Sequence, residues 1–128
     1  MSKLVRFPLV LALLSVAATG AFLHEERSAV AQSHPHISGD WTAFWGGGKT
    51  PMTFTQNGRE VTGTYTGANS GSGRVVGTFE GFRLVGRWHG DKGTAGGFVL
   101  TFSDDNNFTG TWGNGAASSG GGAWNGSR

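Results

Sequence analysis

Four aromatic residues are the side chains of this sequence best suited to bind a small molecule: Trp45, Tyr65, Trp88 and Trp112. A ring face can stack on an aromatic or apolar ligand or on a sugar, and the tyrosine hydroxyl can add a hydrogen bond. We expect these four residues to form a ligand-binding site. The alternative is that all four rings belong to an ordinary hydrophobic core.

A glycine run next to Trp45 resembles part of a phosphate-binding loop. Gly46 to Gly48 are followed by Lys49 and Thr50, which matches the end of that motif. The motif also requires a glycine where this chain has Ala43, and a helix that begins directly after it. No helical periodicity follows, so we interpret the run as a connection between strands.

Two polar segments could in principle bind metal ions. If cleavage during export made Gln32 the first residue, its amine, two backbone amides and the imidazole of His34 would form a square-planar site for Cu(II) or Ni(II). Otherwise His34 lies in a solvated tail. Asp104 and Asp105 suit the tip of a polar hairpin without any metal. We therefore predict neither a metal site nor a cofactor.

No combination of residues predicts catalysis. The serines lack a nucleophile-elbow motif, and His89 has no evident nucleophile as a partner. Glu60 and Glu80 are expected on a polar strand face without a pocket. The sequence therefore predicts a protein that is not an enzyme.

Glycine recurs two residues away from an aromatic ring, which indicates the elements that position these side chains. The chain has 24 glycines, and 12% of its residues are aromatic. The repeat Gly-x-aromatic-x-Gly is centred on Tyr65, Phe79, Trp88 and Trp124. Residues two apart share one face of a β-strand, so each repeat predicts one glycyl-aromatic face and one polar face. A ring from a neighbouring strand can fill the space above a glycine.

The repeats and the turns between them predict an all-β protein. Asn57-Gly58 is a hairpin signal, and residues 104–107 suit a second tight turn. Short links imply an eight-stranded antiparallel up-and-down barrel, and closure removes the exposed sheet edges. The expected strands cover residues 38–45, 51–56, 60–66, 73–80, 83–89, 97–103, 107–112 and 120–127.

The same two-residue period predicts which side chains point into the barrel. Phe44 and Phe82 fall outside this pattern and are expected on the surface. The side chains expected inside are Trp41, Trp45, Phe54, Val61, Tyr65, Val75, Phe79, Leu84, Trp88, Phe98, Leu100, Phe102, Phe108, Trp112 and Trp124.

The N-terminal segment has the pattern of a secretory signal peptide. Lys3 and Arg6 precede an apolar run, and Ala29-Val30-Ala31 matches a signal peptidase site. We predict a signal peptide over 1–31, a flexible tail over 32–37 and the barrel over 38–128. Cleavage near residues 18–20 is the alternative. The expected location is secreted or periplasmic, with no membrane contact beyond the signal peptide.

Charge and cysteine content limit the possible partners. The net charge is +2, with 14% charged residues and no cysteine. So small a charge gives no basis for binding nucleic acid. The absence of cysteine means that the fold needs no disulfide even in an oxidising compartment.

Two short motifs resemble the calycin superfamily of small meander barrels, which includes lipocalins and avidins. Gly39-Asp-Trp41 resembles the first strand of these proteins, in which a tryptophan packs against a basic residue near the last strand; the resemblance implies that role for Arg128. With Gly63-Thr-Tyr65 the chain is also similar to avidins. Ala43 and Gly67 stand where avidins carry polar biotin-binding residues, so the resemblance implies an avidin-like barrel without biotin binding.

These observations predict an exported, non-catalytic binding barrel for a small apolar or aromatic molecule or a glycan. The alternative is a protein-interaction module, either a calycin-type protease inhibitor or an envelope or matrix component. Such inhibitors act through their N-terminal segment and barrel loops, which would assign residues 32–37 to an exported partner protein. An ice-binding surface of Thr-x-Thr stretches is disfavoured, because a small barrel is curved.

Overall fold

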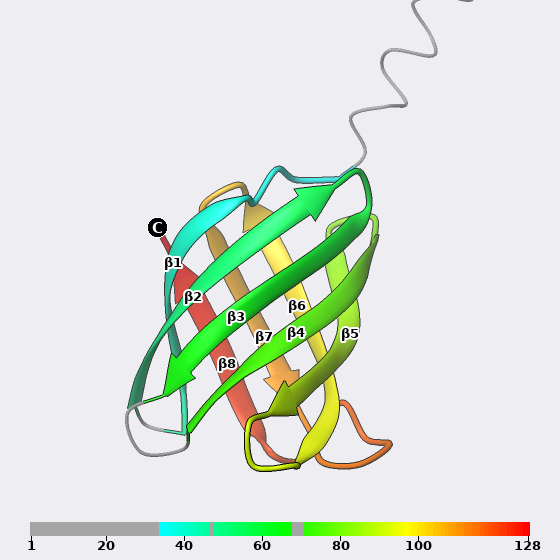
Figure 1. The fold of residues 1–128 in the computed structure, drawn as a ribbon. Coiled ribbons are helices and arrows are strands. Elements are labelled where there is room, and N and C mark those ends of the chain that lie inside the picture. The colour runs from blue at the N-terminus through cyan, green and yellow to red at the C-terminus, as the bar shows by residue number, and fades with distance from the viewer. Residues whose placement is uncertain (1–33, 47, 68–70) are drawn as a thin grey trace, which may run out of the picture. The chain divides into compact units, whose positions relative to one another are not determined.

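The computed structural model describes residues 34–46, 48–67 and 71–128, which form a closed antiparallel barrel (Figure 1). Each strand pairs with its neighbour in the chain, and β1 also pairs with β8. The prediction of an all-β, eight-stranded up-and-down barrel is confirmed. The signal peptide predicted over 1–31 lies outside the described residues. The strands are β1 (Gly39–Trp45), β2 (Gly48–Asn57), β3 (Glu60–Gly67), β4 (Gly71–Glu80), β5 (Arg83–Gly90), β6 (Ala95–Asp104), β7 (Asn107–Trp112) and β8 (Gly122–Ser127).

Aromatic rings and glycines are paired directly across neighbouring strands. Tyr65 of β3 is opposite Gly73 of β4, and Phe108 of β7 is opposite Gly126 of β8. At each of these glycines an added Cβ atom would collide with the ring of its partner. The expectation that rings occupy the space left by glycines is confirmed, and this pairing lets large rings fill a narrow barrel. The same pairing joins Trp88 to Gly96, Phe98 to Gly86 and Trp112 to Gly122.

The centre of the barrel is filled with side chains. Phe102 contacts Trp41, Phe79 and Phe108, with ring centroids 5.2–5.6 Å apart. Burial of large rings supplies most of the stability of so small a core. All fifteen side chains expected inside belong to this core or pack against it, with Trp45 and Trp112 partly buried. The residues of the hydrophobic core that the prediction missed are Ile37, Ala43 and Met52.

Residues 34–38, here called the N-terminal strap, lie against the end of the barrel that contains the β2–β3 turn. Ile37 is fully buried, and its backbone N–H donates to the Oε1 of Gln56 at 2.8 Å. The Gln56 amide nitrogen donates in turn to the carbonyl of Pro35 at 2.9 Å. From His34 onward, the segment expected as a flexible tail over 32–37 is bonded to the barrel, and the apolar side chain of Ile37 reaches the core.

Arg128 joins the strap to the end of the last strand. Its guanidinium lies 4.8 Å from the ring centroid of Trp41 and donates to the carbonyls of His36 and Ser38 at 2.9 and 2.7 Å. The Trp41 indole N–H donates to the carbonyl of Ile37 at 2.9 Å. The contact expected between a first-strand tryptophan and Arg128 is thus present.

Candidate functional site

The four residues predicted to bind a ligand meet at the end of the barrel opposite the strap. Trp45, Tyr65, Trp88 and Trp112 come from four different strands and line one open pocket of about 250 Å³. We call this pocket the aromatic mouth. The barrel topology explains the convergence, because in an up-and-down meander alternate strands run toward the same end, and inward residues near that end become neighbours. The rest of its lining is Gly90, Asp91, Lys92, Thr94 and Asn114.

Trp45 lies among the other rings of the mouth. Its ring centroid is 5.2 Å from Tyr65, 5.8 Å from Trp88 and 5.0 Å from Trp112. The Trp112 ring is nearly parallel to that of Trp45, whereas Trp88 is almost perpendicular to Trp112. Below them, Trp124 packs edge-on against Trp45 at 4.9 Å and is fully buried. The mouth is therefore shallow, with a floor of packed indoles.

Backbone contacts hold the walls of the mouth in place. The indole N–H of Trp88 donates to the carbonyl of Gly113 at 2.9 Å. Gly113 opens the long β7–β8 connection, whose backbone is bonded to β6 by the pairs Gly113–Gly97 and Gly97–Ala117. The β7–β8 connection thus orients the Trp88 ring and is itself bonded to β6. The wall of the mouth formed by Trp88 is therefore held in place without a ligand.

Tyr65 and Asp91 form the polar corner of the mouth. The Tyr65 ring lies over Gly73, and among the described residues its hydroxyl has no hydrogen-bond partner. Burial, with a further contribution from the negative charge of Asp91, raises the pKa of Tyr65 above its ordinary value of 10.0. The phenol is therefore neutral near pH 7 and can donate or accept a hydrogen bond.

The rim residues Asp91, Lys92, Thr94 and Asn114 were not predicted from the sequence. They lie in the β5–β6 and β7–β8 connections, which no local motif marks as functional. One signal was available. In an up-and-down barrel alternate connections lie at the same end, so both connections are at the end where β1 finishes with Trp45.

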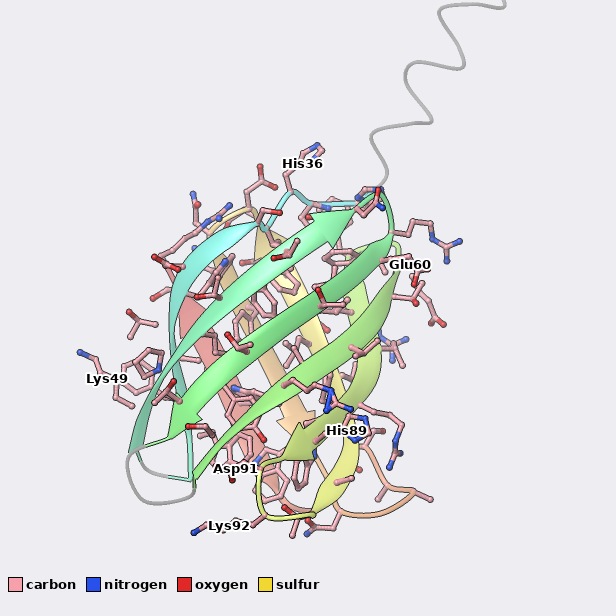
Figure 2. All side chains as sticks on the ribbon, viewed as in Figure 1. His36, Lys49, Glu60, His89, Asp91 and Lys92 are labelled. Carbon is pink, nitrogen blue, oxygen red and sulfur yellow. The ribbon has the colours of Figure 1, made fainter. Side chains whose placement is uncertain are left out.

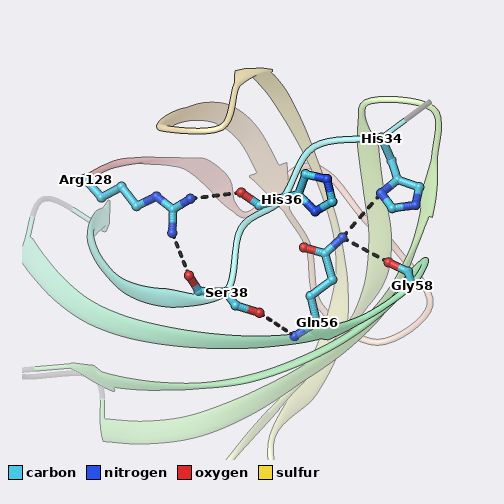
Figure 3. Close-up of a pocket in the computed structure, with 6 residues that line it drawn as sticks. All are labelled: His34, His36, Ser38, Gln56, Gly58 and Arg128. Atoms are coloured by element: carbon cyan, nitrogen blue, oxygen red, sulfur yellow. Dashed lines mark hydrogen bonds between the residues drawn. The ribbon is translucent and has the colours of Figure 1, made fainter. Parts of the chain in front are cut away.

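The end closed by the N-terminal strap has a second pocket, of about 270 Å³, lined by polar side chains (Figure 3). Its polar groups are largely used in holding the strap. Gln56 bonds to the strap through both ends of its amide, and Arg128 donates to strap carbonyls. The His34 ring stacks on Phe79 with centroids 5.7 Å apart. We therefore interpret the polar residues of this pocket as groups that attach the strap to the barrel, rather than as a binding site.

The remaining candidates concern metal ions. No three His, Asp or Glu side chains of the described residues come together as a metal ion would require. The copper or nickel site needs Gln32 and Ser33, which lie outside those residues. Asp104 Oδ1 accepts from the Asn106 backbone N–H at 2.8 Å, so this carboxylate shapes the β6–β7 turn.

No helix in the part of the chain that the structure describes is long and apolar enough to cross a membrane. Comparison of the chain with protein-family models, curated proteins and solved structures found no match. Functional interpretation therefore depends on the geometry of the mouth.

Proposed function

We propose that this protein is an exported, non-catalytic binding barrel that holds a small ligand at the aromatic mouth. The observation that carries the proposal is the convergence of Trp45, Tyr65, Trp88 and Trp112 on one open pocket. The ligand carries an apolar or aromatic group that packs on these rings. Rings held by the surrounding strands lose little freedom on binding, which favours affinity.

The packed interior limits where a ligand binds. The fully buried Trp124, Phe98 and Phe102 occupy the space that a deep ligand would need. A pocket of about 250 Å³ accommodates a small molecule or one end of a larger one. The proposed ligand therefore contacts the mouth and leaves the core unchanged.

The alternative of a protease inhibitor receives less support. It would use residues 32–37 as a free segment that enters a partner. From His34 onward this segment is bonded to the barrel, with Ile37 buried and Gln56 holding its backbone. An inhibitor acting through this segment would first have to release these contacts.

Intrinsic fluorescence provides the experiment. Purified protein is titrated with a panel of metabolites and glycans, and Trp45→Leu is titrated in parallel. The proposal expects a saturable change for at least one ligand and a weaker response in the variant. An unchanged spectrum across the whole panel, with the fold verified by circular dichroism, would refute it.

A further inference from the structure

The charge beside the rings of the mouth indicates the class of ligand. Asp91 follows β5 and lies against the start of β4, where its carboxylate accepts from the Ser72 N–H at 3.4 Å. It is close enough to Tyr65 for its charge to act on that phenol. Aromatic faces attract cations through their quadrupoles, and a neighbouring carboxylate adds a second attraction of the same sign.

A neutral polyol would find few fixed partners at this site. The rim residues Asp91, Lys92, Thr94 and Asn114 are all exposed, and the Trp88 N–H is already bonded to Gly113. Among the described residues of the lining, the Tyr65 hydroxyl is one polar group without a partner, and the Trp112 N–H, also without one, is buried. Ligands recognised by directed hydrogen bonds need polar groups that are held in place. Attraction between a cation, ring faces and a carboxylate depends much less on direction, so it suits a mouth with packed rings and an exposed polar rim.

We infer that the aromatic mouth binds a small organic cation whose nitrogen carries apolar substituents, of the trimethylammonium type. This inference rests on the proposed function and names its ligand class. The methyl groups pack on Trp45, Trp88 and Trp112, and Asp91 lies near the positive charge. Substituents without N–H groups suit the site because the walls offer few free acceptors.

Lys92 is the cation in the lining that opposes such a ligand. It follows Asp91 directly in the β5–β6 connection and is exposed. In Figure 2 its side chain extends away from the end of the barrel into solvent. Its charge is therefore strongly screened by solvent. Removal of the Lys92 charge should change the affinity for a cation in the opposite direction to removal of the Asp91 charge.

The five tryptophans make an NMR titration selective for this site. Choline and tetramethylammonium are added to ¹⁵N-labelled protein, and the indole N–H signals are followed. We expect saturable shifts at Trp45, Trp88 and Trp112, and none at Trp41, which lies beside Arg128 at the other end. The neutral isostere 3,3-dimethylbutan-1-ol should bind about tenfold more weakly, because it lacks the charge that the rings and Asp91 attract.

Three variants separate the contributions. Asp91→Asn should weaken choline binding about threefold, whereas Lys92→Gln should leave it unchanged or strengthen it. Tyr65→Phe keeps the ring and should weaken choline binding less than Asp91→Asn does, whereas a ligand held by the hydroxyl would lose more affinity in Tyr65→Phe. Thermal unfolding of each variant provides the control. It verifies that a change in choline affinity does not result from loss of the fold.

The outcomes separate this inference from the proposed function. If the neutral isostere binds as tightly as choline, or if Asp91→Asn has no effect, the cationic ligand class is wrong while a binding mouth stands. If no ligand of the wider panel shifts the mouth signals, both are wrong. Sedimentation with phosphatidylcholine vesicles asks whether the cation is a lipid headgroup, and binding of free choline without vesicle binding assigns a soluble ligand.

Discussion

Single side chains in this barrel pack in the core and also line the aromatic mouth. Tyr65 covers Gly73 with the hydroxyl end of its ring, and it also lines the mouth together with Asp91. Trp88 is almost fully buried and also lines the same pocket. The sequence left open whether these residues belong to the core or to a binding site, and their burial in the core does not exclude the proposed binding role.

Tyr65 is the only tyrosine of the chain, so its ionisation can be followed directly by ultraviolet absorbance. Burial and the charge of Asp91 raise its pKa above 10.0. The folded state thus retains the proton longer than the unfolded chain. This contribution to stability is complete below about pH 10 and decreases as pH rises through the folded pKa. Asp91→Asn should lower the pKa of Tyr65, and an increase would contradict the assigned cause.

Trp88→Ala tests the register of β5. The indole is only 4% exposed and is bonded to Gly113, so its removal leaves a cavity and an unpaired carbonyl. We expect the free energy of unfolding to fall by about 3–5 kcal/mol in urea denaturation. Phe82→Ala is the matched control, since that ring is 46% exposed and should matter by less than about 0.5 kcal/mol. Equal effects of the two substitutions would refute the register.

At the scale of elements, strand pairing places a glycine opposite many of the large rings. Gly126 of β8 is opposite Phe108 of β7, and Gly63 of β3 is opposite Phe54 of β2. Glycine ordinarily weakens a strand, but here the neighbouring ring shields its backbone. The glycines are therefore part of the packing rather than a sign of low complexity.

Gly126→Ala should destabilise the barrel. An added methyl group would overlap the ring of Phe108, which is itself buried on all sides. Thermal or urea unfolding should show a loss of about 1–3 kcal/mol. Gly48→Ala is the control, because its new Cβ would have its nearest neighbour, the Trp45 carbonyl oxygen, at 4.0 Å. A neutral effect at Gly126 would show that β7 and β8 are not packed in this way.

Arg128 tests the attachment of the N-terminal strap. Removing the guanidinium in Arg128→Ala breaks its bonds to His36 and Ser38 and its contact with Trp41. We expect a loss of about 1–2 kcal/mol and faster amide hydrogen exchange at Ile37. Arg87→Ala, at an exposed position of β5, should change neither quantity. Unchanged exchange in Arg128→Ala would mean that the strap is held by its other contacts, such as those of Gln56 and Trp41.

For the whole domain, one continuous core joins all eight strands. Such a core predicts a single cooperative unfolding transition, with coincident curves from circular dichroism and tryptophan fluorescence. The chain has no cysteine, so the midpoint should be the same with and without a reductant. Separate transitions for the two probes would show that the mouth unfolds independently of the centre.

Much of this fold could be predicted from the sequence because its pattern is local. Alternation of Gly, ring and Gly identified the strands and their inward faces, including Trp41, Phe79 and Trp124. Ile37 was missed because it lies before the first strand, where the two-residue period gives no information. Asp91 was missed because a polar residue in a turn has the same local appearance whether or not a pocket lies beside it.

By itself the sequence determined the fold class, the side of each strand that faces inward and the absence of disulfides. These features depend on neighbours in the chain and on the two-residue period of a β-strand. Only the tertiary structure decided that Trp45, Tyr65, Trp88 and Trp112 share one mouth while the centre is filled. That result depends on closure of the barrel and on the position of each ring along the barrel axis. Both are set by the pairing between strands, which the local sequence pattern does not show.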